Sequence, residues 1–143
     1  MDYQVLKEVI EYAVFGILLF MSLLSVSFAI ERFVYYTNVN LNSFSSKRRL
    51  EIELSKRLST IATIGSNAPY IGLLGTVLGI MMTFLSIGES GIENTKSLME
   101  GLALALKATA LGLVVAIPSI IFYNYLTRKA EVLITEWEIV NEE

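Results

Sequence analysis

Apolar and charged positions are separated into long blocks along the chain. Uncharged runs of 19, 31 and 20 residues extend over 12–30, 58–88 and 108–127, and Lys107 is the only charge within 101–127. A helix of about 20 apolar residues crosses the hydrocarbon core of a bilayer. The pattern therefore predicts an all-α membrane protein of one domain, with transmembrane helices over 12–30, 58–88 and 101–127.

The segments beside these spans are also predicted to be largely helical. The second span begins with a stretch rich in Ser and Thr that we expect to extend beyond the membrane, and helical spacing resumes at Ser55 after a polar loop over 37–46. Apolar residues at steps of three and four continue through 128–143, so the third helix is expected to run on as a tail. Residues 1–11 hold one Lys against three acidic residues, unlike a signal peptide, and are predicted to form an interfacial amphipathic segment.

The charges of the connecting segments predict an orientation in the membrane. Residues 31–57 hold six basic and three acidic side chains, whereas residues 89–100 hold one basic and three acidic side chains. Arg128 and Lys129 directly follow the third span. Because basic residues near span ends stay on the cytoplasmic side, we expect the N-terminus and 89–100 outside, and 31–57 and 128–143 in the cytoplasm.

The composition excludes several kinds of function. The 143 residues are 17% charged, against roughly 25% in ordinary soluble domains. A net charge of −3 argues against a nucleic-acid-binding protein, which needs an excess of Lys and Arg. His and Cys are absent, which excludes disulfides, Cys/His metal sites and His-based catalytic triads. The sequence also lacks paired carboxylates in a plausible pocket and a phosphate-binding loop, so we expect neither an enzyme nor a metal or cofactor.

The second and third spans each carry a stripe of small residues. In the second span the stripe consists of Gly72, Thr76, Gly79 and Thr83. In the third span it consists of Gly101, Ala105, Thr109, Gly112, Ala116 and Ser119. Small residues let helix backbones approach closely in lipid, and a membrane threonine can satisfy its hydroxyl within its own helix. The residues alone favour packing seams, with a narrow lumen lined by sparse hydroxyls as the alternative.

Two prolines and two charges stand out in the same spans. Pro69 and Pro118 are expected to kink their helices, because each removes a backbone hydrogen bond. Glu100 and Lys107 are seven residues apart, which places them on nearly the same helix face, about 10 Å apart along the axis, as a candidate charged rim. We expect Lys107 to snorkel towards headgroups or pair with a neighbouring subunit, in preference to carrying ions.

The two small-residue spans closely resemble one known family. The runs are LSTIATIGSNAPYIGLLGTVLGIMMTF over Leu58–Phe84 and GLALALKATALGLVVAIPSIIFYNYL over Gly101–Leu126. Both resemble the ExbB/TolQ/MotA proton-channel family, nearest the ExbB and TolQ branch. The first span is similar by topology and by its closing ERF, Glu31–Phe33.

The resemblance implies a multi-pass protein of the bacterial inner membrane that forms a homopentamer. Its second and third helices would line a central pore around an ExbD- or TolR-like one-span partner with an intramembrane aspartate. Proton flow past that aspartate would drive a TonB- or TolA-like protein. The family's two threonines map onto Thr76 and Thr109, which would face the pore on the proton pathway. Many relatives have a glutamate where this chain has Leu104, so no proton-carrying glutamate is expected at that place.

Several alternatives remain open from the sequence. The ExbB role in substrate uptake and the TolQ role in envelope integrity are both compatible with the motifs. The transported ion can be H⁺ or Na⁺. A structural membrane scaffold that oligomerises through the small-residue stripes without ion flow is the alternative from a different functional class.

Overall fold

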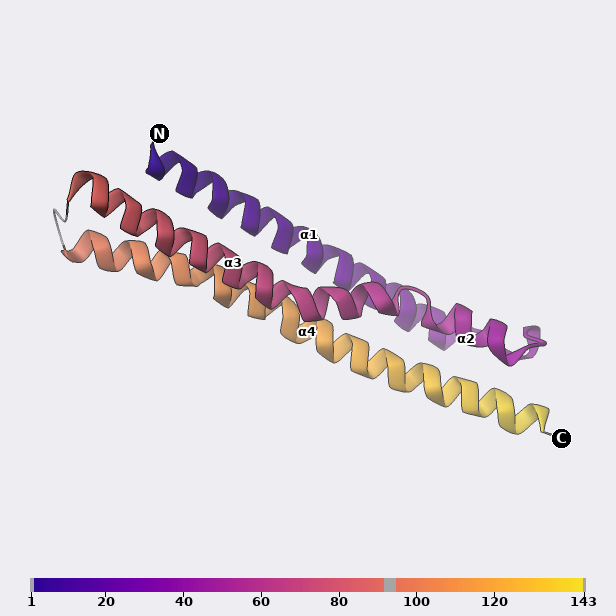
Figure 1. Cartoon of the computed structure of the whole chain (residues 1–143). Coiled ribbons are helices and arrows are strands. Elements are labelled where there is room, and N and C mark those ends of the chain that lie inside the picture. The colour runs from indigo at the N-terminus through magenta and orange to yellow at the C-terminus, as the bar shows by residue number, and fades with distance from the viewer. Residues whose placement is uncertain (1, 92–94, 143) are drawn as a thin grey trace.

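Three long helices lie side by side in a narrow rod, with the two termini at opposite ends (Figure 1). The computed structural model describes residues 2–91 and 95–142, and within these ranges the chain forms helices and turns without any strand. The elements are α1 (Tyr3–Asn38), the 3-10 turn η1 (Leu41–Ser43), α2 (Lys47–Ser55), α3 (Leu58–Ser90) and α4 (Thr95–Asn141). The predicted all-α class is confirmed.

Three of the described helices, α1, α3 and α4, are long and apolar enough to cross a membrane, as predicted. At 1.5 Å per residue, the 47 residues of α4 extend about 70 Å, more than twice the roughly 30 Å hydrocarbon core. The third span and the tail 128–143 therefore belong to one helix through Asn141, and much of α4 lies beyond the hydrocarbon. The chain is a multi-pass membrane protein.

The N-terminal segment is part of α1 and does not form a separate element. The Asp2 side chain accepts a hydrogen bond from the Gln4 N–H at 3.0 Å and caps the helix, which then continues unbroken to Asn38. Residues 3–11 contain no Pro or Gly that would end a helix, and Ile10 packs against the buried side chains of the three-helix core. Residues 3–11 are therefore continuous with the first span, and their predicted position at the membrane interface stays a prediction.

The connection between α1 and α3 is a short helical hairpin. The Asn40 side chain accepts from the Asn42 N–H at 3.1 Å and starts η1 inside the predicted polar loop. Helical spacing was predicted from Ser55 onwards, but the helix breaks after that residue and α3 begins at Leu58. The break lies at Arg57, whose φ of 70° is left-handed and incompatible with a continuous helix.

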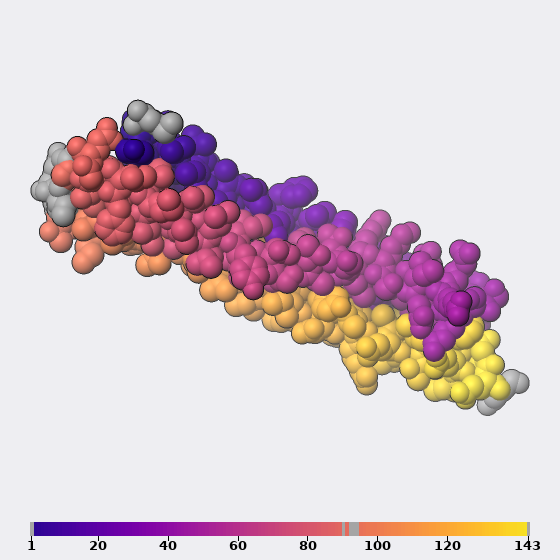
Figure 2. Space-filling view, in the orientation of Figure 1, coloured from indigo at the N-terminus to yellow at the C-terminus, as the bar shows by residue number. Residues whose placement is uncertain are grey.

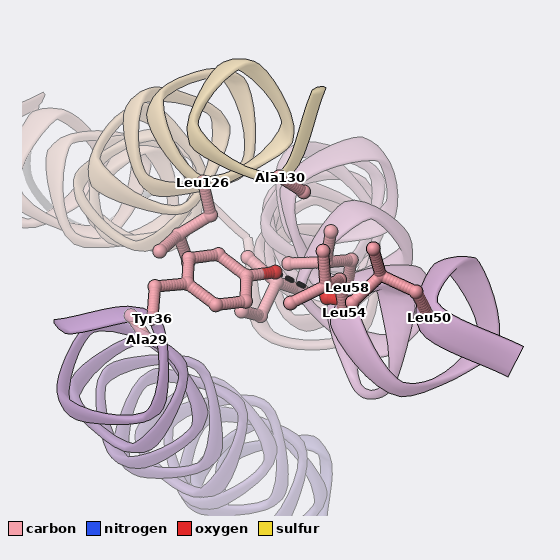
Figure 3. Close-up of a cluster of buried hydrophobic side chains, with 8 residues drawn as sticks. Ala29, Tyr36, Leu50, Leu54, Leu58, Leu126 and Ala130 are labelled. Atoms are coloured by element: carbon pink, nitrogen blue, oxygen red, sulfur yellow. Dashed lines mark hydrogen bonds between the residues drawn. The ribbon is translucent and has the colours of Figure 1, made fainter. Parts of the chain in front are cut away.

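A hydrophobic cluster holds the α2 end of the rod together (Figure 3). Its buried members are Ala29, Tyr36, Leu50, Leu54, Leu58, Ile61, Leu126 and Ala130, which come from all four helices. The Tyr36 hydroxyl donates to the Leu54 carbonyl inside this cluster, and burial raises the pKa of Tyr36 to about 12. The Trp137 indole N–H donates to the Phe44 carbonyl at 3.1 Å, which ties the tail of α4 to the connection.

Arg32 joins α1 to the end of α2. Its side chain is 3% exposed, donates to the Glu31 carboxylate and the Glu53 carbonyl at 2.6 Å each, and lies 4.4 Å from the centre of the Tyr35 ring. Arg57 contacts the same Glu31 carboxylate at 3.0 Å. The hydrogen bond from Arg32 holds the pKa of Glu31 below its ordinary value, because it stabilises the charged form. This buried cation is fully paired, as a charge in a low-dielectric environment requires.

Figure 2 shows the side chains of the long helices filling a narrow rod. Many bulky apolar side chains along the predicted spans are exposed on the surface of this rod. On α1, the exposed bulky side chains include Leu19, Phe20, Leu23 and Ile30. On α3, Leu73, Val77 and Phe84 are each about half exposed, on a face turned away from the small-residue stripe. An exposed apolar surface of this extent is expected of a membrane protein.

Candidate functional site

Two glycines bring the backbones of α3 and α4 into direct contact. A Cβ atom added at Gly72 would lie 2.5 Å from the Ala108 carbonyl oxygen, and one added at Gly112 would lie 2.6 Å from the Ala68 carbonyl oxygen. Real Cβ atoms essentially never approach so closely. The two glycines also face each other, because the Cβ position of each lies 3.1 Å from the Cα of the other. No larger side chain fits at this crossing.

The close approach lets Thr76 bond to the backbone of the other helix. Its hydroxyl donates to the Ala105 carbonyl of α4 at 3.0 Å and accepts the Thr109 backbone N–H at 3.2 Å. In an α-helix the N–H of residue 109 normally pairs with the carbonyl of residue 105. The Thr76 hydroxyl therefore bonds to both the donor and the acceptor of one backbone hydrogen bond of α4. Thr76 is 6% exposed and lies one turn from Gly72 along α3.

The Thr109 hydroxyl is the second member of the site. Its oxygen lies 2.5 Å from the Thr76 hydroxyl oxygen, and Thr109 itself is only partly buried. Either hydroxyl can be the donor in this contact. When the single Thr76 proton is directed to the Ala105 carbonyl, the donor is Thr109. The lone pairs of the Thr109 oxygen are then available to a further group. The two threonines that the resemblance placed on the proton pathway are thus in contact, and they join α3 to α4.

The remaining stripe residues continue the α3–α4 contact. A Cβ at Gly79 would lie 3.0 Å from the Ala105 Cβ, so these two predicted residues face each other. Ala116 is 1% exposed and belongs to the buried cluster of the three-helix core. At the crossing, Gly72 and Gly112 occupy the narrowest point. The predicted small-residue stripes therefore form one continuous seam inside this chain.

A lysine from α1 lies at the end of the seam nearest the α3–α4 turn. Lys7 donates through its ammonium to the Thr83 hydroxyl at 3.0 Å and to the Gly101 carbonyl at 3.5 Å. Thr83 in turn donates to the carbonyl of Gly79 at 2.9 Å, within its own helix. Thr83 and Gly101 were predicted from the stripes, but Lys7 was not. Lys7 reaches this site because α1 includes residues 3–11. The charged residues around Lys7 hid this continuation of the helix in the sequence.

The two charges of the candidate rim lie in different surroundings. Glu100 is exposed and borders a cavity of about 340 Å³ whose wall also includes Lys7 and Thr83. Lys107 is exposed and places its ammonium 4.9 Å from the centre of the Phe15 ring of α1. A cation over an aromatic face is favourable, so Lys107 has a contact within this chain that the sequence did not reveal.

Two prolines and one buried pair of hydroxyl groups lie further along the rod. Pro69 and Pro118 both lie inside helices, α3 and α4, which continue past them. Ser25 of α1 and Ser119 of α4 are almost fully buried, and their hydroxyl oxygens lie 2.7 Å apart. Ser119 belonged to the predicted stripe, whereas nothing in the sequence distinguished Ser25 from Ser22 and Ser27 of the same span.

Known proteins resemble this chain over nearly its whole length. The family described as the MotA/TolQ/ExbB proton channel family matches residues 36–139, a range that includes both threonines and both glycines of the crossing. A biopolymer transport protein ExbB from Aquifex aeolicus is 56% identical over 138 residues, which are 96% of this chain and 93% of that protein.

Two further relatives are named for different systems. A putative biopolymer transport protein ExbB-like 2 from Helicobacter pylori is 51% identical over 134 residues, covering 94% of this chain and 89% of that protein. A Tol-Pal system protein TolQ from Pseudomonas aeruginosa is 43% identical over 86 residues, covering 60% of this chain and 37% of that protein. The ExbB relatives are therefore matched almost end to end, and the TolQ relative only in part.

Proposed function

This chain belongs to the MotA/TolQ/ExbB proton channel family, and from that premise we propose that it is an ExbB-like subunit of an energy transducer driven by the proton-motive force. In this proposal, five copies form a ring in the bacterial inner membrane. The ring surrounds an ExbD-like one-span partner with an intramembrane aspartate. Its work is passed to a TonB-like protein for uptake through the outer membrane.

The observation that carries this proposal is the hydroxyl pair of Thr76 and Thr109 in the middle of the α3–α4 seam. An ionised aspartate in the hydrocarbon core is costly unless polar groups surround it. A threonine hydroxyl donates a hydrogen bond to a carboxylate and accepts one from the protonated acid, so it can serve both states of the partner residue. The partly exposed Thr109 is the member of the pair that can meet such a group.

The surface of the rod supports a ring. The apolar side chains of α1 suit lipid, which agrees with α1 on the outside and α3 and α4 towards the centre. We propose the orientation that follows from the basic segments 31–57 and 128–143, with both in the cytoplasm and the N-terminus outside. Lys7 and Glu100 would then lie on the outer side, where the proton enters.

A TolQ-like role is the second candidate, and the Pseudomonas aeruginosa relative supports it. The two roles differ in the protein that receives the work, which is TonB-like in one and TolA-like in the other. The end-to-end match to ExbB relatives favours the first. A membrane scaffold that conducts no ions is the third candidate function. Such a function needs only the packing seam between α3 and α4.

Co-expression with candidate one-span partners tests the proposal. The purified complex is weighed by native mass spectrometry, reconstituted into liposomes, and assayed for proton uptake under an imposed pH gradient, with Na⁺ varied to identify the ion. We expect five copies of the chain per complex, with the partner bound. Thr109→Val should lower transport about tenfold or more and leave the mass unchanged, because the side chains are nearly isosteric.

Thr135→Val is the matched control for this experiment. Thr135 lies on the exposed tail of the same helix, and its hydroxyl bonds only to the Glu131 carbonyl of its own helix at 3.0 Å. Its loss should leave both mass and transport unchanged. A stable monomer in mild detergent would contradict the ring. Full transport by Thr109→Val would leave the packing seam as the better interpretation of α4.

A further inference from the structure

We infer that Thr76 and Thr109 have different tasks: Thr76 is a fixed positioning residue, and Thr109 is the hydroxyl that exchanges its hydrogen bond with the partner carboxyl. This inference rests on the proposed function and assigns a role to each hydroxyl within it. It follows from the hydrogen-bond partners, the burial of the two residues and the chemistry of a hydroxyl group.

The bonds of Thr76 are already committed within the chain. A hydroxyl has one proton to donate and two lone pairs to accept with. The Thr76 proton is donated to the Ala105 carbonyl at 3.0 Å, and one lone pair accepts the Thr109 N–H at 3.2 Å. Both partners are backbone groups of α4 and do not turn away. With 6% of its surface exposed, Thr76 also lacks room for an outside group.

The bond of Thr109 is the exchangeable one. With the Thr76 proton on Ala105, the Thr109 hydroxyl is left to donate to the remaining lone pair of Thr76. Thr109 is also the partly buried member of the pair. When the partner aspartate is protonated, its O–H can donate to the Thr109 oxygen while the Thr109 proton stays on Thr76. When the aspartate is ionised, the Thr109 hydroxyl turns and donates to the carboxylate. Thr109 neither gains nor loses a proton in this exchange, because only the direction of its hydrogen bond changes.

Thr76 keeps its two backbone bonds in both states, so it holds Thr109 within reach of the partner. Without the Thr76 hydroxyl, Thr109 can turn back and bond to the Ala105 carbonyl one turn earlier in its own helix, as membrane threonines commonly do. The effect of Thr76 on transport is therefore exerted through Thr109. The two substitutions should not act independently.

A double-mutant cycle on proton uptake by the reconstituted complex tests this division. We expect Thr109→Val to lower uptake by about tenfold or more, as the loss of a hydrogen bond to a charged group implies. Thr76→Val should lower it less, and Thr76→Ser should restore it, since serine retains the hydroxyl. The double variant should transport no less than Thr109→Val alone. Thr63→Val and Thr135→Val, on exposed parts of α3 and α4, are the controls and should resemble the wild type.

Unfolding of the purified chain without any partner gives the second measurement. Thr76→Val should shift the unfolding midpoint in SDS further downwards than Thr109→Val does, because Thr76 alone bonds to the backbone of the other helix. If the reductions in uptake multiply in the double variant, or if both single variants shift the unfolding midpoint equally, Thr76 and Thr109 do not have different tasks. Transport by the wild-type complex would still support the proposed function in that case. An intact wild-type complex that conducts no ions would overturn both.

Discussion

Replacement of Gly112 by alanine should separate α3 from α4. The added Cβ would lie 2.6 Å from the Ala68 carbonyl oxygen, and ordinary contact begins at 3.4 Å, so the helices must open by the difference of 0.8 Å. Both groups in contact belong to helix backbones and cannot move as a side chain would. Overpacking of this kind costs about 1–3 kcal/mol.

The same opening would break the bonds of Thr76. Its 3.0 Å contact with Ala105 would lengthen to about 3.8 Å, beyond the range of a hydrogen bond, at a further cost of about 1 kcal/mol. Alanine recovers about 0.5–1 kcal/mol as a better helix former than glycine. We therefore expect Gly112→Ala to lower the free energy of unfolding by roughly 1–3.5 kcal/mol.

Gly16→Ala is the matched control, because it is the same chemical change inside a helix. A Cβ at Gly16 meets nothing within 4 Å, so this variant should gain stability by about 0.5–1 kcal/mol. The assay is the unfolding of the purified chain in mixed micelles titrated with SDS, followed by helical circular dichroism. If Gly112→Ala proves as stable as Gly16→Ala, the backbone contact does not constrain the seam and the reasoning fails.

Three further substitutions test contacts outside the seam, by the same unfolding assay. Ser25→Ala removes the buried hydroxyl contact between α1 and α4 and should cost about 1 kcal/mol, whereas Ser27→Ala, at an exposed site, should cost almost nothing. Arg32→Ala should cost about 3 kcal/mol, because it removes a buried, fully paired cation, and the exposed Arg128→Ala should change stability by less than about 0.5 kcal/mol. Because the pKa of Glu31 is lowered by folding, the contribution of its ion pair is complete above its ordinary value of 4.5 and is lost as the pH falls through the lowered value. Acid should therefore destabilise the wild type more than Glu31→Gln, and identical pH profiles would contradict the pairing.

The three spans could be predicted from the sequence because they depend on composition alone. The gaps between charges predicted α1, α3 and α4, and the steps between small residues predicted a packing or pore-lining face on each of α3 and α4. Each of these features repeats along one helix, so one helix is enough to detect it.

Features that depend on the register between helices could not be predicted. The pairing of Thr76 with the backbone at Ala105 joins residues 29 positions apart, and no spacing in the sequence encodes that distance. Lys7 reaches Thr83 only because α1 continues straight from its charged first turns. Arg57 takes the left-handed conformation without a glycine to signal it, since Arg32 and Glu31 hold the end of α2 from another helix.

The sequence presented the small-residue stripes either as packing seams or as borders of a polar pathway, and the crossing shows why these readings need not compete. Only glycine at 72 and 112 lets the backbones approach closely enough for the Thr76 hydroxyl to reach the α4 backbone. In the division of tasks inferred above, that bond makes Thr109 the donor between the two hydroxyls and leaves its lone pairs free. If the proposed function is correct, loss of packing at the crossing must also impair transport. Gly112→Ala should therefore reduce proton uptake even in complexes that still assemble, and normal uptake by such complexes would separate the two roles again.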